Sequence, residues 1–220
     1  MTRPVAVLRP EPGNAATAAR AEALGLRVLR LPLFVVTPVA WAVPDASAYD
    51  ALILTSANAL RHGGAGLAAL RALPVFAVGE RTAESARDAG FDVMTTGTAD
   101  LAALLTLAEA QGVANALHLG GRDRVAVQSP AIRSTIAIYA SDAVAIAPDT
   151  LRLIDGSVAL LHSARAARRL AALAGNRMSI RIAALSEAVN EAAGPGWAGH
   201  AVAARPDDDA LLATARMLAD

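Results

Sequence analysis

Two stretches of the chain decide its fold: ALILTSANA at Ala51–Ala59 and VALLHSARA at Val158–Ala166. Each begins with four consecutive apolar residues, which is typical of a strand covered on both faces, as in a parallel sheet. Each then passes through a serine into alanine-rich sequence, where a helix is expected to begin after an N-cap residue. This alternation of strand and helix predicts crossover units and a doubly wound α/β fold.

The two stretches are separated by a constant offset of 107 positions, which continues beyond them. Gly79 and Ser186 differ by 107, and so do Asp100 and Asp207. Further pairs at this offset are Ser56 and Ser163, Glu80 and Glu187, Glu84 and Glu191, and Leu104 and Leu211. We interpret the offset as two copies of one βαβα unit. The alternative is that two unrelated α/β segments share spacing and alanine content.

The same alternation runs along the rest of the chain. Short β-branched, apolar runs predict strands, and the Ala/Leu-rich stretches between them have helical spacing. Strands are expected at Pro4–Arg9, Arg27–Leu33, Ala51–Ser56, Pro74–Gly79, Phe91–Thr96, Ala116–Gly120, Thr135–Tyr139, Ser157–Ser163, Arg181–Ser186 and His200–Arg205. Helices are expected at Ala15–Leu24, Glu80–Ala89, Ala99–Gln111, Ala164–Ala174 and Asp207–Ala219, among others.

Two extended segments, Leu33–Val43 and Ile136–Ile146, are poorly suited to a helix. Pro38 interrupts the first, and a Ser-Asp pair interrupts the second. We interpret them as two strands that cross between lobes. The expected organisation is a discontinuous terminal lobe (1–33 and 144–220), a middle lobe (38–138) and linkers at 34–37 and 139–143.

Composition excludes several classes of function. The 220 residues carry a formal net charge of zero, which argues against a general nucleic-acid binder. The chain has no lysine, which excludes Schiff-base and P-loop chemistry, and no cysteine, which excludes disulfides and thiol catalysis. No apolar run is long enough to span a membrane, and no signal peptide is evident. We therefore expect a cytoplasmic protein without nucleic-acid or membrane partners.

Small hydroxyls, glycines and arginines follow the predicted strands, at the ends where doubly wound folds bind ligands. Glycine allows a ligand to approach backbone N–H groups, and helix N-termini favour anions. The set therefore suits a ligand that carries several carboxylates. The candidate residues are Thr55, Ser56, Asn58, Gly79, Thr82, Gly120, Gly121, Arg122, Ser163 and Ser186.

These candidates have structural alternatives. Taken singly, Ser56, Asn58, Ser163 and Ser186 fit helix N-caps better than ligand contacts. Gly79 is also compatible with a tight turn, and residues 122–124 with a solvated charge cluster. The four histidines show no spacing that pairs them with an acid as metal ligands, so no metal site is expected, and we interpret His118 and His162 as structural. Tyr139 is compatible with either interfacial packing or catalysis.

The motifs taken together resemble the uroporphyrinogen-III synthase family over nearly the whole chain. Tyr49–Ala59 resembles its strand ending in Thr-Ser-x-Asn, and Val78–Ala83 resembles its Val-Gly-x-x-Thr-Ala turn. Val7–Pro10, which contains Arg9, resembles the opening strand and loop. Later landmarks are Leu119–Arg122, Ile138-Tyr139 and Leu161–Ser163.

The resemblance implies two flavodoxin-like lobes with parallel sheets, joined by a two-stranded linker, with a cleft between the lobes. It implies a hydro-lyase without metal or organic cofactor, in tetrapyrrole and heme biosynthesis, and we expect it to act as a monomer. Hydroxymethylbilane, with hydroxymethylbilane synthase as its candidate donor, would lose water, and ring D would be inverted as the macrocycle closes to uroporphyrinogen III. Tyr139 matches the family tyrosine proposed to assist departure of the hydroxyl, and Ser56 and Thr82 match positions proposed to line the cleft. We count Arg9 with the substrate-binding candidates.

The sequence also departs from the family pattern. Leu185–Val189 stands where threonines usually follow the second glycine turn, so that Ser186 is at most a partial substitute. The segment from Arg124 to Tyr139 is short for the usual helix and strand, which predicts a trimmed lobe. An inactive homologue and a non-catalytic two-lobed module that binds a small anionic ligand therefore remain as alternatives.

Overall fold

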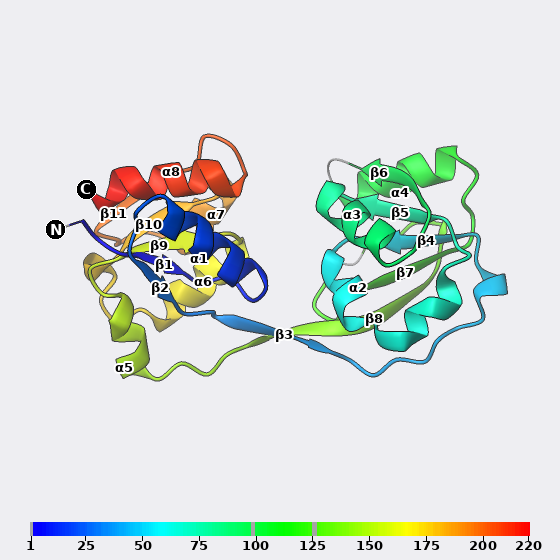
Figure 1. The fold of residues 1–220 in the computed structure, drawn as a ribbon, viewed down its shortest axis with the longest axis horizontal. Coiled ribbons are helices and arrows are strands. Elements are labelled where there is room, and N and C mark those ends of the chain that lie inside the picture. The colour runs from blue at the N-terminus through cyan, green and yellow to red at the C-terminus, as the bar shows by residue number, and fades with distance from the viewer. Residues whose placement is uncertain (1, 98–99, 125–126) are drawn as a thin grey trace. The chain divides into compact units, whose positions relative to one another are not determined.

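The structure is a computed structural model that describes residues 2–97, 100–124 and 127–220 (Figure 1). The chain forms two compact units. One, the terminal unit, consists of Met1–Val35 and Asp142–Asp220, and the other, the middle unit, of Val36–Ser141. Within the described ranges, no helix has the length and apolar composition needed to cross a membrane.

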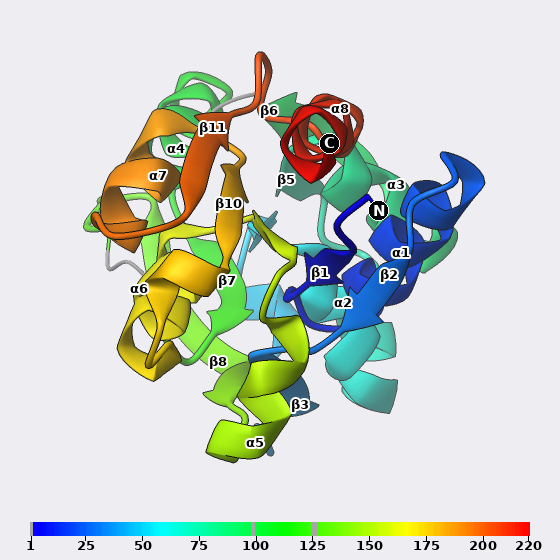
Figure 2. The ribbon, with the colours of Figure 1, turned by 90° about the vertical axis from the view of Figure 1, so that its left-hand side faces the viewer.

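The terminal unit contains a parallel five-stranded sheet in the order β11-β10-β9-β1-β2. Its strands are β1 (Val5–Val7), β2 (Val28–Arg30), β9 (Val158–Leu161), β10 (Arg181–Ala184) and β11 (Gly199–Val202). Numbered along this unit, the order is 2-1-3-4-5, as in flavodoxin-like folds. Helices α6 (Ala164–Leu173) and α7 (Glu187–Ala193) cover one face, and α1 (Gly13–Ala23) and α8 (Asp208–Ala219) cover the other (Figure 2). A short helix, α5 (Pro148–Leu151), precedes β9.

The apolar runs of these strands are explained by burial on both faces. In β1, Val5 and Val7 pack in the core beneath α1 and α8, whereas Ala6 lies in the core beneath α6 and α7. In β9, Leu160 and Leu161 divide between the same two cores. A strand that is covered on both faces needs an apolar residue at every position, and every residue of β1 and β9 is apolar.

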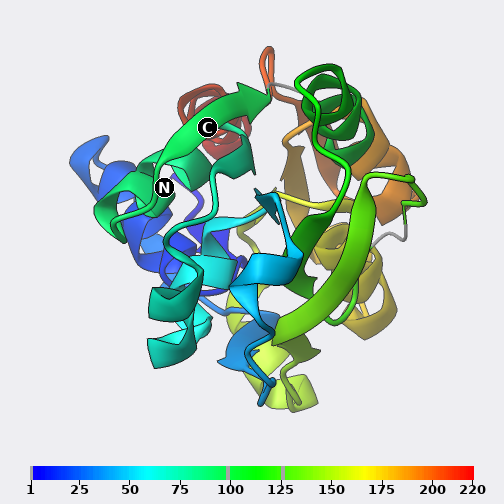
Figure 3. The ribbon, with the colours of Figure 1, turned by 90° about the vertical axis from the view of Figure 1, so that its right-hand side faces the viewer.

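The sheet of the middle unit has six strands in the order β3-β8-β7-β4-β5-β6, of which β3 and β8 each extend two residues beyond the bounds of that unit. The strands are β3 (Phe34–Pro38), β4 (Ala51–Leu54), β5 (Val75–Val78), β6 (Val93–Gly97), β7 (Ala116–Gly121) and β8 (Ile132–Ala143). Helices α2 (Ala57–His62) and α3 (Glu80–Asp88) contribute to one core, and α4 (Leu101–Ala110) to the other. Figure 3 views this unit, with the long strand β8 in front.

The sheets are mostly parallel, as predicted, and one strand pair is antiparallel. The backbone N–H of Val39 donates to the carbonyl of Ile138, and that of Val144 donates to the carbonyl of Leu33, at 3.0 Å each. Residue numbers therefore rise along β3 as those of their partners in β8 fall, so β3 runs antiparallel to β8. The remaining pairs are parallel. An antiparallel edge strand on a parallel sheet is common in such folds.

Equivalent elements in the two units agree with the predicted repeat. Strands β4, β5 and β6 are neighbours in one sheet, as β9, β10 and β11 are in the other. Asp100 N-caps α4 by accepting from the N–H of Ala103 at 2.9 Å, and Asp207 N-caps α8 by accepting from that of Ala210 at 2.8 Å. Strand β7 takes the place of β1, and β8 takes that of β2.

One helix breaks this equivalence. In the terminal unit α1 connects β1 to β2, whereas the described part of residues 122–131, between β7 and β8, contains no helix. The predicted trimming of a lobe is therefore confirmed in the middle unit. The start of the helix predicted from Ala99 lies outside the described residues, and its described part begins at Leu101.

Candidate functional site

In the middle unit, the Thr-Ser-x-Asn motif lies where β4 ends and α2 begins. The Ser56 side chain accepts from the backbone N–H of Asn58 at 3.2 Å, which confirms Ser56 as the N-cap. Asn58 lies inside the first turn, so it is not a cap, and its Oδ1 accepts from Arg61 at 3.1 Å. Thr55, directly after the strand, is half-buried.

The next turn along the sheet, between β5 and α3, depends on Gly79. Its φ of 76° lies in the left-handed region, where a side chain would be strained. Its N–H donates to the carbonyl of Gly97 at 2.8 Å, and a Cβ at this position would meet nothing within 4 Å. Thr82, in the first turn of α3, is buried. The glycine thus provides an open backbone approach beside a helix N-terminus.

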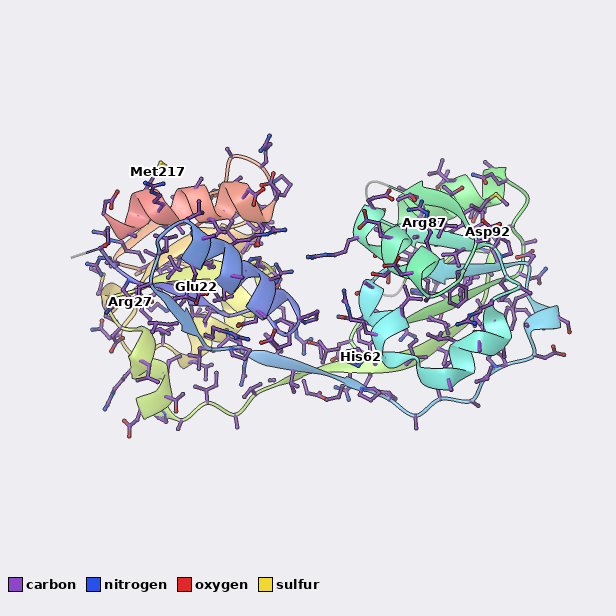
Figure 4. The ribbon with its side chains drawn as sticks, in the orientation of Figure 1. Glu22, Arg27, His62, Arg87, Asp92 and Met217 are labelled. Atoms are coloured by element: carbon purple, nitrogen blue, oxygen red, sulfur yellow. The ribbon has the colours of Figure 1, made fainter. Side chains whose placement is uncertain are left out.

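Tyr139 lies against the end of β7 because Gly121 has no side chain. The two residues are partners across β7 and β8, and a Cβ on Gly121 would be 2.9 Å from the Tyr139 ring and 3.2 Å from its hydroxyl. The N–H of Arg122 donates to the Tyr139 carbonyl at 2.8 Å. The ring of His62, at the end of α2, lies 6.4 Å from that of Tyr139, centroid to centroid (Figure 4 shows His62).

The arginines that follow β7 differ in their contacts. Arg122 is exposed and forms an ion pair with Asp123 at 3.4 Å, as the charge-cluster alternative predicts. Arg124 instead donates from Nη1 to the carbonyl of Gly121 at 3.0 Å. Gly120 lies between His118 and Arg124, since a Cβ there would be 3.1 Å from Nε2 of the former and 3.4 Å from Cδ of the latter.

In the terminal unit, Asp208 organises a cluster at the carboxyl ends of β1 and β9. Its Oδ1 lies 2.8 Å from Nε2 of His162, and its Oδ2 accepts from the Thr17 hydroxyl at 2.9 Å. Arg9 reaches the same Oδ1 at 3.5 Å and Thr17 at 3.3 Å, and Arg20 reaches Oδ2 at 3.3 Å. We call Arg9, Thr17, His162 and Asp208 the Asp208 cluster.

Burial and hydrogen bonding have opposite effects on the pKa values of Asp208 and His162. Burial raises the pKa of Asp208, but the hydrogen bonds from His162 and Thr17 and the charge of Arg9 outweigh it and hold that pKa at about 2. Burial lowers the pKa of His162, although the hydrogen bond to Asp208 opposes this. Asp208 is therefore ionised at neutral pH, with Arg9 beside it.

The other two candidates in this unit are at helix starts. Ser163 N-caps α6 by accepting from the N–H of Ala166 at 3.2 Å, which confirms the capping alternative. Ser186 occupies the N-cap position of α7 without a side-chain capping bond. Arg9, Ser163 and Ser186 thus follow the neighbouring strands β1, β9 and β10.

Comparison with known proteins identifies the family. The family model described as uroporphyrinogen-III synthase HemD matches residues 15–213. This chain belongs to the uroporphyrinogen-III synthase family. The predicted family and enzyme class, a hydro-lyase, are therefore confirmed. No curated protein matches the sequence.

Solved uroporphyrinogen-III synthases have the same fold. The enzyme of Helicobacter pylori 26695 is 17% identical, with a TM-score of 0.69 over 99% of this chain and 100% of the other. A mutant of the enzyme from the extremely thermophilic bacterium Thermus thermophilus is also 17% identical, with a TM-score of 0.55 over 99% of each chain. The two-sheet α/β architecture predicted from the sequence is that of these synthases.

In this synthase family member, the candidate residues of each sheet lie at or after the carboxyl ends of its strands. Residues 55–58 and 79–82 follow the adjacent strands β4 and β5, residues 120–122 are at the end of β7, and Tyr139 lies in the next strand, β8. The sequence did not predict that His162 and Thr17 meet at Asp208. The only signal was an acid in the first turn of α8 and a histidine directly after β9. Among the described residues, no group of three histidines or acids could hold a metal ion.

Proposed function

We propose that this chain converts hydroxymethylbilane to uroporphyrinogen III, with inversion of ring D and loss of water. The observation that carries the proposal is the family match over residues 15–213. The two motif turns and Tyr139, which lie at one edge of the middle sheet, support it. The reaction needs no metal or organic cofactor, as the resemblance to the family implies.

Tyr139 is the proposed catalytic residue. Its phenol donates to the oxygen of the departing hydroxyl, so that the carbon–oxygen bond breaks and the oxygen leaves as water. The contact of Gly121 with the ring supports this role, because it fixes the phenol at the end of β7. A positioned acid of this kind contributes rate by donating in the transition state.

The remaining candidates are proposed to bind the substrate. Hydroxymethylbilane carries several carboxylates, which suit arginines and the backbone N–H groups of helix N-termini. Holding a flexible chain with its ends together lowers the entropic cost of ring closure in the chemical step. The proposed binding residues are Arg9, Thr55, Ser56, Asn58, Gly79, Thr82, Gly120, Gly121, Arg122, Ser163 and Ser186.

We propose a cytoplasmic monomer that receives its unstable substrate from hydroxymethylbilane synthase. Residues 34–37 and 139–143 act as the linkers between the lobes 38–138 and 1–33 with 144–220. Strands β3 and β8, which run through these segments, support this assignment.

The test supplies hydroxymethylbilane and separates the uroporphyrinogen isomers. The expected product is uroporphyrinogen III. Uroporphyrinogen I alone, which is the spontaneous product, would overturn the proposal, and tetrapyrrole binding without turnover would instead fit a non-catalytic binding module.

Tyr139→Phe tests the catalytic role separately. We expect kcat to fall by roughly 10²-fold, because the positioned donor is lost. The midpoint of thermal unfolding should stay unchanged, since the ring that packs on Gly121 is retained. A variant with wild-type kcat would exclude the hydroxyl from catalysis.

A further inference from the structure

The described part of the middle unit has no counterpart of α1, and this changes one face of its sheet. In the terminal unit, Ala18 and Ala21 of α1 pack with Val7 of β1 in the core beneath α8. In the middle unit, the strand register places His118 of β7 where Val7 stands, because Ile53 pairs with His118 as Leu160 pairs with Val7. In the described part of this unit, α4 is the one helix in that core.

A cavity of about 350 Å³ occurs at this place. It is lined by Thr55, Val78, Asp100, Leu101, Ala102, His118, Arg124 and Val127. At the 107-residue offset, Thr55 and Leu101 correspond to His162 and Asp208. The position that the Asp208 cluster fills in the terminal unit is thus a pocket in the middle unit, which we call the α4 pocket.

His118 contributes a buried and unpaired polar atom to the α4 pocket. The side chain is 2% exposed, and Nε2 has no hydrogen-bond partner among the residues that the structure describes. Burial, and then the charge of Arg124, lower the pKa of His118 to about 4, so the ring is neutral at pH 7. A buried ring nitrogen without a partner is unfavourable, and a ligand that pairs with it removes that cost.

The other polar groups of the pocket favour an anion. Arg124 and His118 converge on Gly120, whose missing side chain leaves room for both. The pocket lies at the start of the ten-residue helix α4, but the Asp100 carboxylate already caps that N-terminus, so Arg124 is the group that supplies positive charge for an anion. Thr55 adds a hydroxyl donor.

The remaining lining limits which anion fits. Val78, Leu101 and Val127 provide apolar walls, which suit an aliphatic tail. The carboxylate of Asp100 also lines the pocket and would repel a second negative charge on the ligand. The volume of about 350 Å³ is sufficient for a carboxylate head group with a short tail.

We propose that the α4 pocket binds a monocarboxylate with a short aliphatic tail, the carboxylate lying between Arg124 and His118. The pocket is separate from the position of Tyr139, which packs with the core on the opposite face of the same sheet. The carboxylate belongs either to a free acid or to an arm of the substrate. Only the second source rests on the proposed function.

Binding can be tested without turnover by titrating the protein with butyrate and following the His118 imidazole signal by NMR. His118→Val assigns that signal, because it removes one of four histidines. We expect a saturable shift with butyrate and none with butylamine, which has the same tail and the opposite charge. No saturable shift, or an equal response to butylamine, would overturn the proposal.

Arg124→Gln provides the decisive variant. We expect it to weaken butyrate binding roughly tenfold or more, because a charge-assisted hydrogen bond is lost. Arg133→Gln is the matched control, since Arg133 is an arginine of the same unit that does not line the pocket, and it should bind butyrate as wild type does. Equal affinity of the two variants for butyrate would exclude Arg124 and overturn the proposed site.

The two sources of the carboxylate are separated by kinetics with hydroxymethylbilane. If an arm of the substrate occupies the pocket, butyrate raises KM competitively, and Arg124→Gln raises KM while kcat changes less. If a free acid is the ligand, butyrate shifts the His118 signal, but Arg124→Gln leaves KM for hydroxymethylbilane unchanged, because Thr55 is the one described pocket residue shared with the proposed substrate contacts. Should the chain prove inactive, the NMR result still decides whether the pocket binds, so the two proposals fail independently.

Discussion

The two units have equivalent strands in equivalent order, but they differ at the position that the Asp208 cluster occupies in the terminal unit. In the terminal unit, Thr17 of α1 closes that position by donating to Asp208, which also binds His162. In the middle unit the corresponding helix is absent from the described residues, and His118 lies beside a cavity without a partner. The comparison shows that a candidate binding pocket replaces a hydrogen-bonded cluster where the described residues contain no connecting helix and where Thr55 and Leu101 stand at the positions of His162 and Asp208.

The largest effect should come from breaking the Asp208 cluster. Asp208→Ala leaves His162 and Thr17 buried without their acceptor, which should cost about 2–3 kcal/mol of unfolding free energy. Urea unfolding followed by the fluorescence of Trp197, which is buried in the terminal core, measures this in a Trp41→Phe background.

Asp209→Ala is the control for this variant. Asp209 is also in the first turn of α8, but its side chain is 82% exposed. Its loss should change the unfolding free energy by less than about 0.5 kcal/mol. Equal costs for the two variants would mean that the cluster does not stabilise the terminal unit, and the contrast between the units would fail.

A smaller effect is expected from the titration of His118. Its pKa is about 4 in the folded chain and about 6.5 when unfolded, so the unfolded state binds a proton first as the pH falls. Between pH 7 and pH 5 the folded middle unit should therefore lose about 2 kcal/mol through this group.

His62 of the same unit also has a lowered pKa. Because His62 is present in both the wild type and the His118→Val variant, the difference between these two proteins isolates the contribution of His118. Unfolding is followed through Trp41, which packs on the middle core, in a Trp197→Phe background. If the difference in unfolding free energy between the two proteins does not change with pH, His118 is not buried in the neutral form.

The smallest effect tests the equivalence itself. Asp100→Ala and Asp207→Ala each remove one helix N-cap and should each cost about 1 kcal/mol. The same two fluorescence reporters measure each cost in its own unit. Costs that differ severalfold would show that α4 and α8 are not equivalent in energy, although they are equivalent in position.

The sequence predicted the strands and the repeat well because both leave a local signature. A strand covered on two faces has an uninterrupted apolar run, and a capped helix starts after a serine or aspartate, as at Ser56 and Asp207. These patterns involve neighbouring residues, so they can be read without the fold.

The polar contacts could not be predicted in this way. Thr17 and Asp208 are 191 positions apart, and neither lies in a pattern that indicates the other. The contact between Gly121 and Tyr139 depends on a register shift between β7 and β8 at Gly120 and Gly121, which no spacing in the sequence indicates. The shortness of the segment after Arg124 predicted a trimmed lobe, but not that the space would lie beside His118.

The pairing of β3 with β8 has a consequence for how the chain is made. Val5 of β1 pairs with Val158 of β9, so the terminal sheet cannot be completed until the ribosome has synthesised the whole middle unit. The middle unit is continuous in sequence and can fold first during synthesis. Once it has folded, the hydrogen bond from Val39 to Ile138 holds its two ends together, and the long loop that β1 and β9 must close becomes short in entropic terms.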